Sequence, residues 1–213
     1  MAGLRWALVS PIPLKLWGFA VSHRFVYLLM INLAVSACAY TPEKAEIAPH
    51  VDSNQSNIGM GKAVAVFVTD GRDTSDIGHR GAGAIASGAT ISNDQNIPDV
   101  FRQAIFDGLK SKGFTPTDPS NSAARQLHVE IRSIGYSTST GFWTGGVETK
   151  AALSCRASVQ NNSYEHVYRF NNEERVMFVP TASHNNDLIN HAVDSVLKEM
   201  FDDQALMNLL ASH

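Results

Sequence analysis

The sequence predicts an α+β domain with a mixed, mostly antiparallel sheet and two main helices packed on one face of that sheet. Three observations predict it. An apolar strand at 63–69 precedes a helical pattern at 98–112, alternating patterns fill 127–179, and a strongly amphipathic helix closes the chain. Each of the two helices has a single apolar stripe. Both therefore need the same sheet face, and the other face is left partly exposed to solvent.

Residues 1–37 have the features of a secretory signal of the lipoprotein kind. Arg24 precedes an apolar run from Phe25 to Val35, small residues follow, and Cys38 comes next, an arrangement that resembles a bacterial lipobox. The cysteine thiolate is a nucleophile that can accept a diacylglycerol group. Acyl chains such as palmitate would then hold the protein on a membrane, at about 0.8 kcal/mol per buried methylene. The apolar run is shorter than the roughly 20 residues that span a bilayer.

The residue after Cys38 indicates a location. An aspartate there is the usual inner-membrane retention signal in enteric-type bacteria, so Ala39 favours the outer membrane, with the domain facing the periplasm. The signal is long, and both Met1 and a position near Val21 stay open as the translation start. Residues 38–62 are rich in Pro, Asn, Ser and Glu with little periodicity. We expect them to be a lipid anchor and flexible tether.

The charge balance excludes some partners. The chain has 17 basic and 20 acidic residues, and the expected signal removes three of the basic ones, which lowers the net charge to −6. That balance argues against nucleic acid and anionic lipid headgroups as partners. Once Cys38 is acylated, Cys155 has no partner for an intrachain disulfide.

The expected single domain, 63–213, begins with a strand that is apolar on both faces and is therefore expected in the middle of the sheet. The turn DGRD at 70–73 ends it, a glycine-rich loop runs to about residue 88, and 89–92 form a possible short strand. In the helix that follows, Pro98 and Asp99 suit the first turn and Gly113 suits the position after the last turn.

Three strand patterns come next. In the first, the inward alternation of Leu127, Val129 and Ile131 slips by one residue at 132–133, which predicts a β-bulge. The segment GFWTGG at 141–146 is typical of a hairpin connection to the second. Its inward residues are small or aliphatic, Cys155 among them, and the thiol is therefore expected to pack as a small hydrophobe rather than act as a nucleophile. The third, 164–179, is one strand or two strands broken near 171–172. Outward residues mark the solvated face: His128, Glu130 and Arg132.

The closing helix has a continuous apolar stripe from Leu188 to Phe201. Asp202–Asp203 is expected to cap a short final helix that carries Leu206, Leu209 and Leu210.

The order and the amino-acid sequences of these segments resemble those of the YajG family of bacterial lipoproteins. The resemblance lies in Cys38 with its lipobox, in VFVTDGRD, VFRQAIFDGLKSKGF and LHVEIRSIGY, in YRFNNEERVMF, and in INHAVDSVLKEMFDDQALMNLLA. It covers nearly all of 63–211, and none of these segments is a catalytic signature. The resemblance implies an envelope lipoprotein whose biochemical role is unassigned.

Two places could contact a ligand or partner. Asp70, Arg72 and Asp73 lie at the carboxyl end of a strand, where sites are often built, and His79 and Arg80 on the same loop could join them. The alternative is a plain turn stabilised by an Asp–Arg pair. Trp143, beside Phe142 between glycines on a hairpin tip, could form a contact patch, or the tip could fold back on the domain.

Other patterns carry less weight. Gly81–Ala86 has the letters of a dinucleotide fingerprint but does not turn directly from a strand into a helix. His184 and His191 lie two helical turns apart without a third ligand nearby, so we expect no metal. No GxSxG elbow is present, and no cofactor is expected.

The sequence therefore predicts a non-enzymatic, lipid-anchored envelope lipoprotein with a periplasm-facing binding domain, whose partner is an envelope protein or a cell-wall component. The alternative is a small-ligand-binding envelope protein that uses the loop from Asp70 to Arg80.

Overall fold

The computed structural model describes residues 42–51, 54–80, 89–140, 145–176 and 180–212. The chain divides into two units, Met1–Cys38 and Ala39–His213, and every described residue belongs to the second. The signal, the acylation site and Ala39 therefore lie outside the described residues.

The described strands form one mixed sheet in which the longest pairings are antiparallel. The strands are β1 (Glu43–Lys44), β2 (Ala63–Asp70), β3 (Gly78–Arg80), β4 (Ala89–Ser92), β5 (Thr115–Thr117), β6 (Arg125–Thr140), β7 (Gly145–Val159) and β8 (Asn162–Val176). The described residues also form three helices: α2 (Ile97–Ser111), α3 (Ala182–Asp202) and α4 (Gln204–Ala211). The predicted α+β class is confirmed.

The middle of the sheet is β6 rather than the first strand of the domain. One side of β6 pairs with β7 along its whole length, and the other side pairs in parallel with β2 at one end and with β3 at the other. β2 is an interior strand, because β5 pairs with its far side, but β5 has only three residues. The length of β6 explains its place, because a shorter strand could not join both β2 and β3.

The predicted β-bulge is present in β6. Ile131 lies opposite Leu153 and Ser133 opposite Ala152, so Arg132 is the extra residue. The bulge keeps Ile134 and Tyr136 on the same buried face as Leu127, Val129 and Ile131, as the slipped alternation predicts. β8 continues without a break through Asn171–Asn172, which decides between the one-strand and two-strand interpretations.

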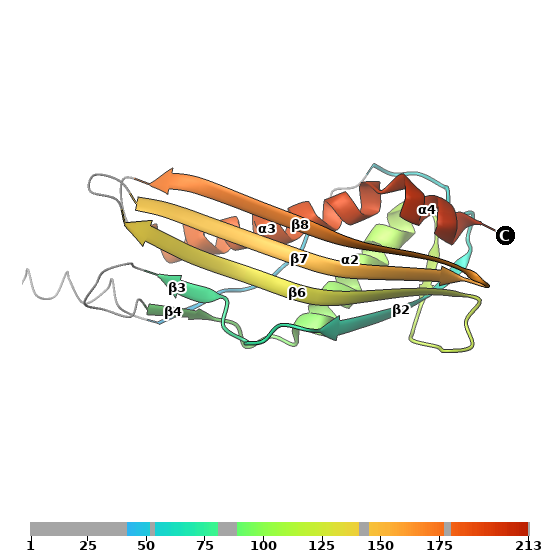
Figure 1. Ribbon diagram of the computed structural model, residues 1–213, viewed down its shortest axis with the longest axis horizontal. Coiled ribbons are helices and arrows are strands. Elements are labelled where there is room, and N and C mark those ends of the chain that lie inside the picture. Colours follow the sequence, from blue (N-terminus) through green and yellow to red (C-terminus); the bar gives the residue numbers. More distant parts are fainter. Residues whose placement is uncertain (1–41, 52–53, 81–88, 141–144, 177–179, 213) are drawn as a thin grey trace, which may run out of the picture. The chain divides into compact units, whose positions relative to one another are not determined.

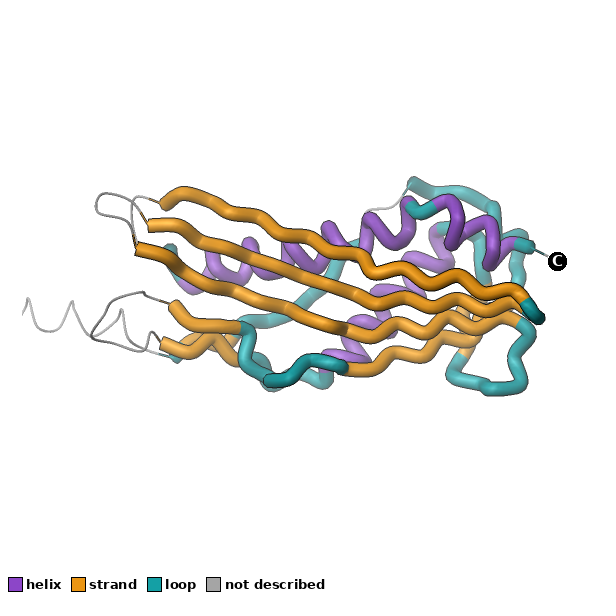
Figure 2. The backbone as a smooth tube through the Cα atoms, in the orientation of Figure 1, coloured by secondary structure: helices purple, strands orange, loops and turns teal. Residues whose placement is uncertain are grey.

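All three helices lie on one face of the sheet, behind the strands in Figures 1 and 2. α2 packs on β2, and α3 and α4 pack on β7 and β8. The core between the layers is apolar, and its largest fully buried side chains are Tyr168, Phe101, Phe201, Ile47, Ile91, Ile105, Leu109, Leu127, Ile131, Leu153, Ile189 and Leu197. The predicted packing of the main helices on a single face is confirmed.

The predicted helix ends are confirmed at two places. Gly113 follows α2 with φ +82°, and the N–H of Phe114 donates to the carbonyl of Leu109 at 3.0 Å, which closes the helix. At the start of α4, Asp203 Oδ1 accepts from the N–H groups of Ala205 and Leu206 at 2.8 and 3.2 Å.

The structure differs from the expected tether in the segment before β2. From residue 42 this segment packs on the domain, and Ala45 and Ile47 are buried. The N–H groups of Glu46, Ala48 and His50 donate to side-chain oxygens at every fourth residue of α3: Asn186, Asn190 and Asp194. Four helical residues rise about 6 Å, and two extended residues span nearly the same length. The spacing of the three N–H groups therefore matches the spacing of the three side-chain oxygens on α3.

Candidate functional site

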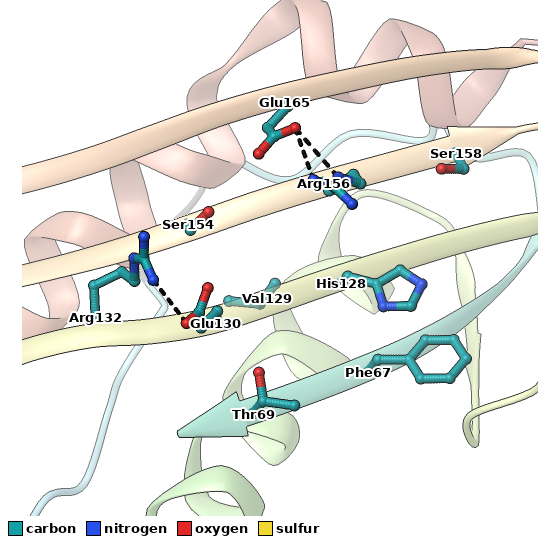
Figure 3. A pocket seen from close by; sticks show the side chains of 10 residues that line it. All are labelled: Phe67, Thr69, His128, Val129, Glu130, Arg132, Ser154, Arg156, Ser158 and Glu165. Atoms are coloured by element: carbon teal, nitrogen blue, oxygen red, sulfur yellow. Dashed lines mark hydrogen bonds and ion pairs between the residues drawn. The ribbon is translucent and has the colours of Figure 1, made fainter. Parts of the chain in front are cut away.

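The helix-free face of β2, β6, β7 and β8 is the first candidate site, and we call it the open face. A hollow of about 570 Å³ lies on it. Ten residues of the four strands line it (Figure 3): Phe67, Thr69, His128, Val129, Glu130, Arg132, Ser154, Arg156, Ser158 and Glu165. Val129 is a buried core residue, and the others point away from the helices. The lining thus combines hydroxyls, two guanidinium–carboxylate pairs and one aromatic stack.

The aromatic stack joins β2 to β6. The rings of Phe67 and His128 are nearly parallel, with centroids 4.1 Å apart and an interplanar angle of 6°. Burial, and then the nearby Arg156, lower the pKa of His128, which favours the neutral imidazole at neutral pH. The stack therefore offers a flat, uncharged surface among polar groups.

Two ion pairs border the stack. Arg132 Nη1 lies 2.8 Å from Glu130 Oε1, and Arg156 Nη2 lies 3.1 Å from Glu165 Oε2. All four side chains are at least one-third exposed, so the pairs add little to stability. Their donors and acceptors are instead accessible to a binding partner.

The predicted DGRD site lies just beyond this hollow, at the end of β2. Arg72 holds Asp70 through two hydrogen bonds, from Nε to Oδ1 at 2.8 Å and from Nη2 to Oδ2 at 2.7 Å. These side-chain bonds lower the pKa of Asp70 against the opposing effect of burial. Gly71 packs closely against Glu130, a lining residue of the hollow, because a Cβ on Gly71 would lie 2.2 Å from Glu130 Oε1. Asp73 is exposed.

The structure does not bring His79 and Arg80 into the same site. Asp70 pairs with Ile131 and Gly78 with Tyr136, which places β3 about 15 Å farther along β6. His79 is exposed, whereas Arg80 is buried and its Nη1 lies 3.2 Å from Glu43 Oε2. Trp143, with Phe142 and Gly81–Ala86, lies outside the described residues.

Arg80 belongs to a buried polar network that the sequence analysis missed. Tyr136 Oη donates to Asn185 Oδ1 at 2.6 Å, and Asn185 Nδ2 donates to Glu43 Oε2 at 3.1 Å. Burial and the nearby Glu43 raise the pKa of Tyr136 to about 12. One signal could have revealed the network: Asn185 is a polar residue on the face that α3 otherwise fills with apolar side chains.

A second hollow, of about 590 Å³, lies between β8 and α3, lined by His166, Tyr168, Phe170, Ser195, Lys198, Glu199, Asp202 and Asp203. Asp203 Oδ2 accepts from the hydroxyls of Tyr164 and Tyr168, both at 2.6 Å. Burial raises the pKa of Asp203, but these two bonds and those from Leu206 and Ala205 outweigh it. The pKa of this carboxyl therefore lies below its usual value.

Few groups in the described part of the chain resemble a catalytic or metal site. Cys155 is fully buried, as predicted, and burial raises the pKa of its thiol to about 12. His184 lies 3.7 Å from Glu174, and the ring of His191 meets Phe170 edge-on. No cluster of three potential metal ligands occurs among the described residues. Nor do these residues include a helix that is long and apolar enough to cross a membrane.

The family described as "Uncharacterized lipoprotein" matches residues 49–211. The chain belongs to this family. The match confirms the resemblance to YajG-like lipoproteins, and the protein is an envelope lipoprotein of unassigned role. No curated protein matches the lipoprotein chain.

Several solved structures resemble this lipoprotein at low identity. One is a protein of the DUF330 family from Xanthomonas campestris: 11% identity, TM-score 0.46, covering 81% of this chain and 94% of that one. Another is a homologue of neuraminyllactose-binding hemagglutinin from Helicobacter pylori: 7% identity, TM-score 0.41, covering 76% and 93%. A minor lipoprotein from Acinetobacter baumannii has 6% identity and a TM-score of 0.38, covering 71% and 94%.

Proposed function

We propose that this lipoprotein is anchored by acyl chains on Cys38 to the periplasmic face of the outer membrane, and that its domain is a non-enzymatic binding module. Membership of a lipoprotein family supports the anchor, together with the lipobox and with Ala39 after the cysteine. Two or more acyl chains would hold the domain stably, since one chain alone gives only marginal membrane binding.

The open face is the surface that would bind the partner. The observation that carries this proposal is the hollow across four neighbouring strands, with its exposed ion pairs and the Phe67–His128 stack. Such a surface offers both hydrogen-bond donors and acceptors and a flat ring surface. These groups suit an envelope protein or a hydroxyl-rich cell-wall polymer.

The anchor is tested by metabolic labelling with palmitate. We expect label on the wild-type chain and none on Cys38→Ser, with Cys155→Ser as the matched control that keeps the label. Label that persists on Cys38→Ser would refute the anchor.

The binding surface is tested by photo-crosslinking in cells from residues on the open face, Thr69 and Ser154, and from Trp143. Asp107, on the exposed side of α2, serves as the control position. We expect Thr69 and Ser154 to trap the same envelope component and Asp107 to trap none. Adducts that form equally from all positions, or from none, would contradict the assignment of the open face.

A small-ligand site at the DGRD turn is the second candidate function, favoured by one observation. Arg72 Nη1 is buried and has no hydrogen-bond partner among the described residues, although the rest of its guanidinium is held by Asp70. A carboxylate or phosphate oxygen could accept from it. Acetate or phosphate should then raise the melting temperature of the wild type but not of the Asp70→Ala, Arg72→Ala double variant. An equal response in both would exclude this site.

A further inference from the structure

The borders of the sheet are protected unequally. β5 has three residues including Pro116, and β1 has two, so these borders offer few free backbone groups. β8 has fifteen residues, no proline and an unbroken register against β7. Natural edge strands are usually short, bulged or interrupted by proline because a long free edge pairs readily with another strand.

The outer side of β8 lies at the border of the sheet (Figure 1), and among the described residues no strand pairs with it. Its backbone groups can therefore extend the sheet by one more strand. A partner strand of equal length is present in every other copy of the chain.

We propose that β8 pairs antiparallel with β8 of a second copy about a two-fold axis at Phe170, so that one sheet runs through both copies. In this register Glu165 lies opposite Arg175 of the second copy, and His166 lies opposite Glu174. The symmetry repeats both pairs, which gives four favourable contacts along the new edge.

Neighbouring registers are less complementary. An axis at Arg169 places that residue opposite itself and Glu165 opposite Glu173, and an axis at Asn172 places Arg169 opposite Arg175. An axis at Asn171 gives only one kind of favourable pair, Arg169 with Glu173. The axis must pass through a residue because opposite residues of an antiparallel pair share a face.

The side chains that the proposed pairing uses are at least partly exposed. Glu165, which would face Arg175, is 56% exposed, and Phe170 at the axis is half-buried beside the hollow between β8 and α3. The two Phe170 rings would therefore meet where the hollows of the two copies join. An aromatic pair across two neighbouring strands stabilises their pairing. The proposed pairing concerns the edge of β8, which meets the open face at Glu165.

Crosslinking of the full chain in cells tests the register. Phe170→Cys should give a species of twice the chain mass on mild oxidation or with a short bismaleimide. The Glu165→Cys, Arg175→Cys double variant should do the same and leaves Phe170 intact. These two positions lie about 33 Å apart on one strand and cannot link within a chain. Thr69→Cys is the exposed control, and the wild-type chain shows whether Cys38 or Cys155 contributes.

Charge exchange tests the complementarity. In the Phe170→Cys chain, Arg175→Glu should lower the crosslinked fraction roughly tenfold, because attraction becomes repulsion at two symmetric positions. Adding Glu165→Arg should restore it. Three outcomes would overturn the proposal: no doubled species from either cysteine variant, no rescue by the second charge change, or a product whose mass shows a different partner protein.

Discussion

The two faces of β6 and β7 share one backbone and differ in almost everything else. On the helix side Leu127, Val129 and Ile131 are at most 1% exposed, whereas His128, Glu130 and Arg132 point to the other side and line the hollow of the open face. Period-two alternation explains which residues point to each side. The helix layer, and not the strands, decides which of the two faces becomes core.

Because the two faces differ in this way, substitutions can change stability on one face and binding on the other. Substitutions on the helix side remove buried apolar contacts, and substitutions on the open face remove exposed polar ones. Four comparisons of variants test that separation, from the largest expected effect to the smallest.

The largest effect is expected between two adjacent residues of β7. Leu153→Ala should lower the free energy of unfolding by about 2–5 kcal/mol, because Leu153 is 1% exposed and its loss leaves a cavity. Ser154→Ala, its neighbour on the open face, should change it by less than about 0.5 kcal/mol. Urea unfolding measures both, and equal losses would show that the open face is also part of the stabilising core.

The helix layer itself is tested at the crossing of α2 and α3. A Cβ on Gly108 would lie 2.4 Å from ring carbons of Phe201, which is fully buried. Gly108→Ala should therefore destabilise the domain by about 1–3 kcal/mol, despite alanine's better helix propensity. Gln103→Ala, on the exposed side of α2, serves as the control in the same thermal or urea unfolding. A gain in stability at Gly108 would mean that the two helices can move apart at little cost.

The carboxylate of Asp203 is expected to contribute less and to depend on pH. Asp203→Ala removes a helix cap and the acceptor of two tyrosine hydroxyls, a loss of about 1–2 kcal/mol at pH 7. The pKa of Asp203 is lowered in the folded state. Its contribution is therefore complete above the unfolded value near pH 4 and is lost as the pH falls through the folded value.

Unfolding of wild type and Asp203→Ala between pH 7 and pH 3 measures this dependence. The difference between the two proteins should shrink below about pH 4. Asp203→Asn, which retains the capping oxygen, should lose less stability than the alanine variant. A difference that grows in acid would contradict the assignment.

The smallest effect on stability is expected from Arg156→Ala on the open face. Its pair with Glu165 is more than half exposed, so the free energy of unfolding should change by less than about 0.5 kcal/mol. The charge of Arg156 helps to lower the pKa of His128, and its removal should raise that pKa. NMR titration of the His128 ring measures the shift, with Arg132→Ala for comparison. A loss above 1 kcal/mol would mean that the open face is stabilising.

Local patterns in the sequence predicted much of this fold. The slip at Arg132, the capping Asp203, the glycine after α2 and the buried Cys155 all follow from spacing or residue type within a few positions. The candidate site was predicted less well. The outward positions of His128, Glu130 and Arg132 were expected, but not their meeting with Phe67 and with Arg156 in one hollow.

Contacts between distant segments account for what was missed. The docking of Glu46, Ala48 and His50 on α3 joins residues 140 to 144 positions apart, through side-chain oxygens that have no distinctive local pattern. The Glu43–Asn185–Tyr136 network is of the same kind. The turn residues Asp70 and Arg72 form an ion pair within the turn. Arg80 instead forms an ion pair with Glu43, because β1 places Glu43 close to it.

The sequence by itself determined the alternation of each strand, the stripes and ends of the helices, and the family to which the lipoprotein belongs. Only the tertiary structure decided that β6 lies in the middle, that the segment from residue 42 is part of the domain, and that β8 is the long border strand of the described sheet. The physical reason is that periodicity and capping act over a few residues. Strand order and buried polar pairs, by contrast, depend on which distant surfaces can satisfy one another's backbone and side-chain groups.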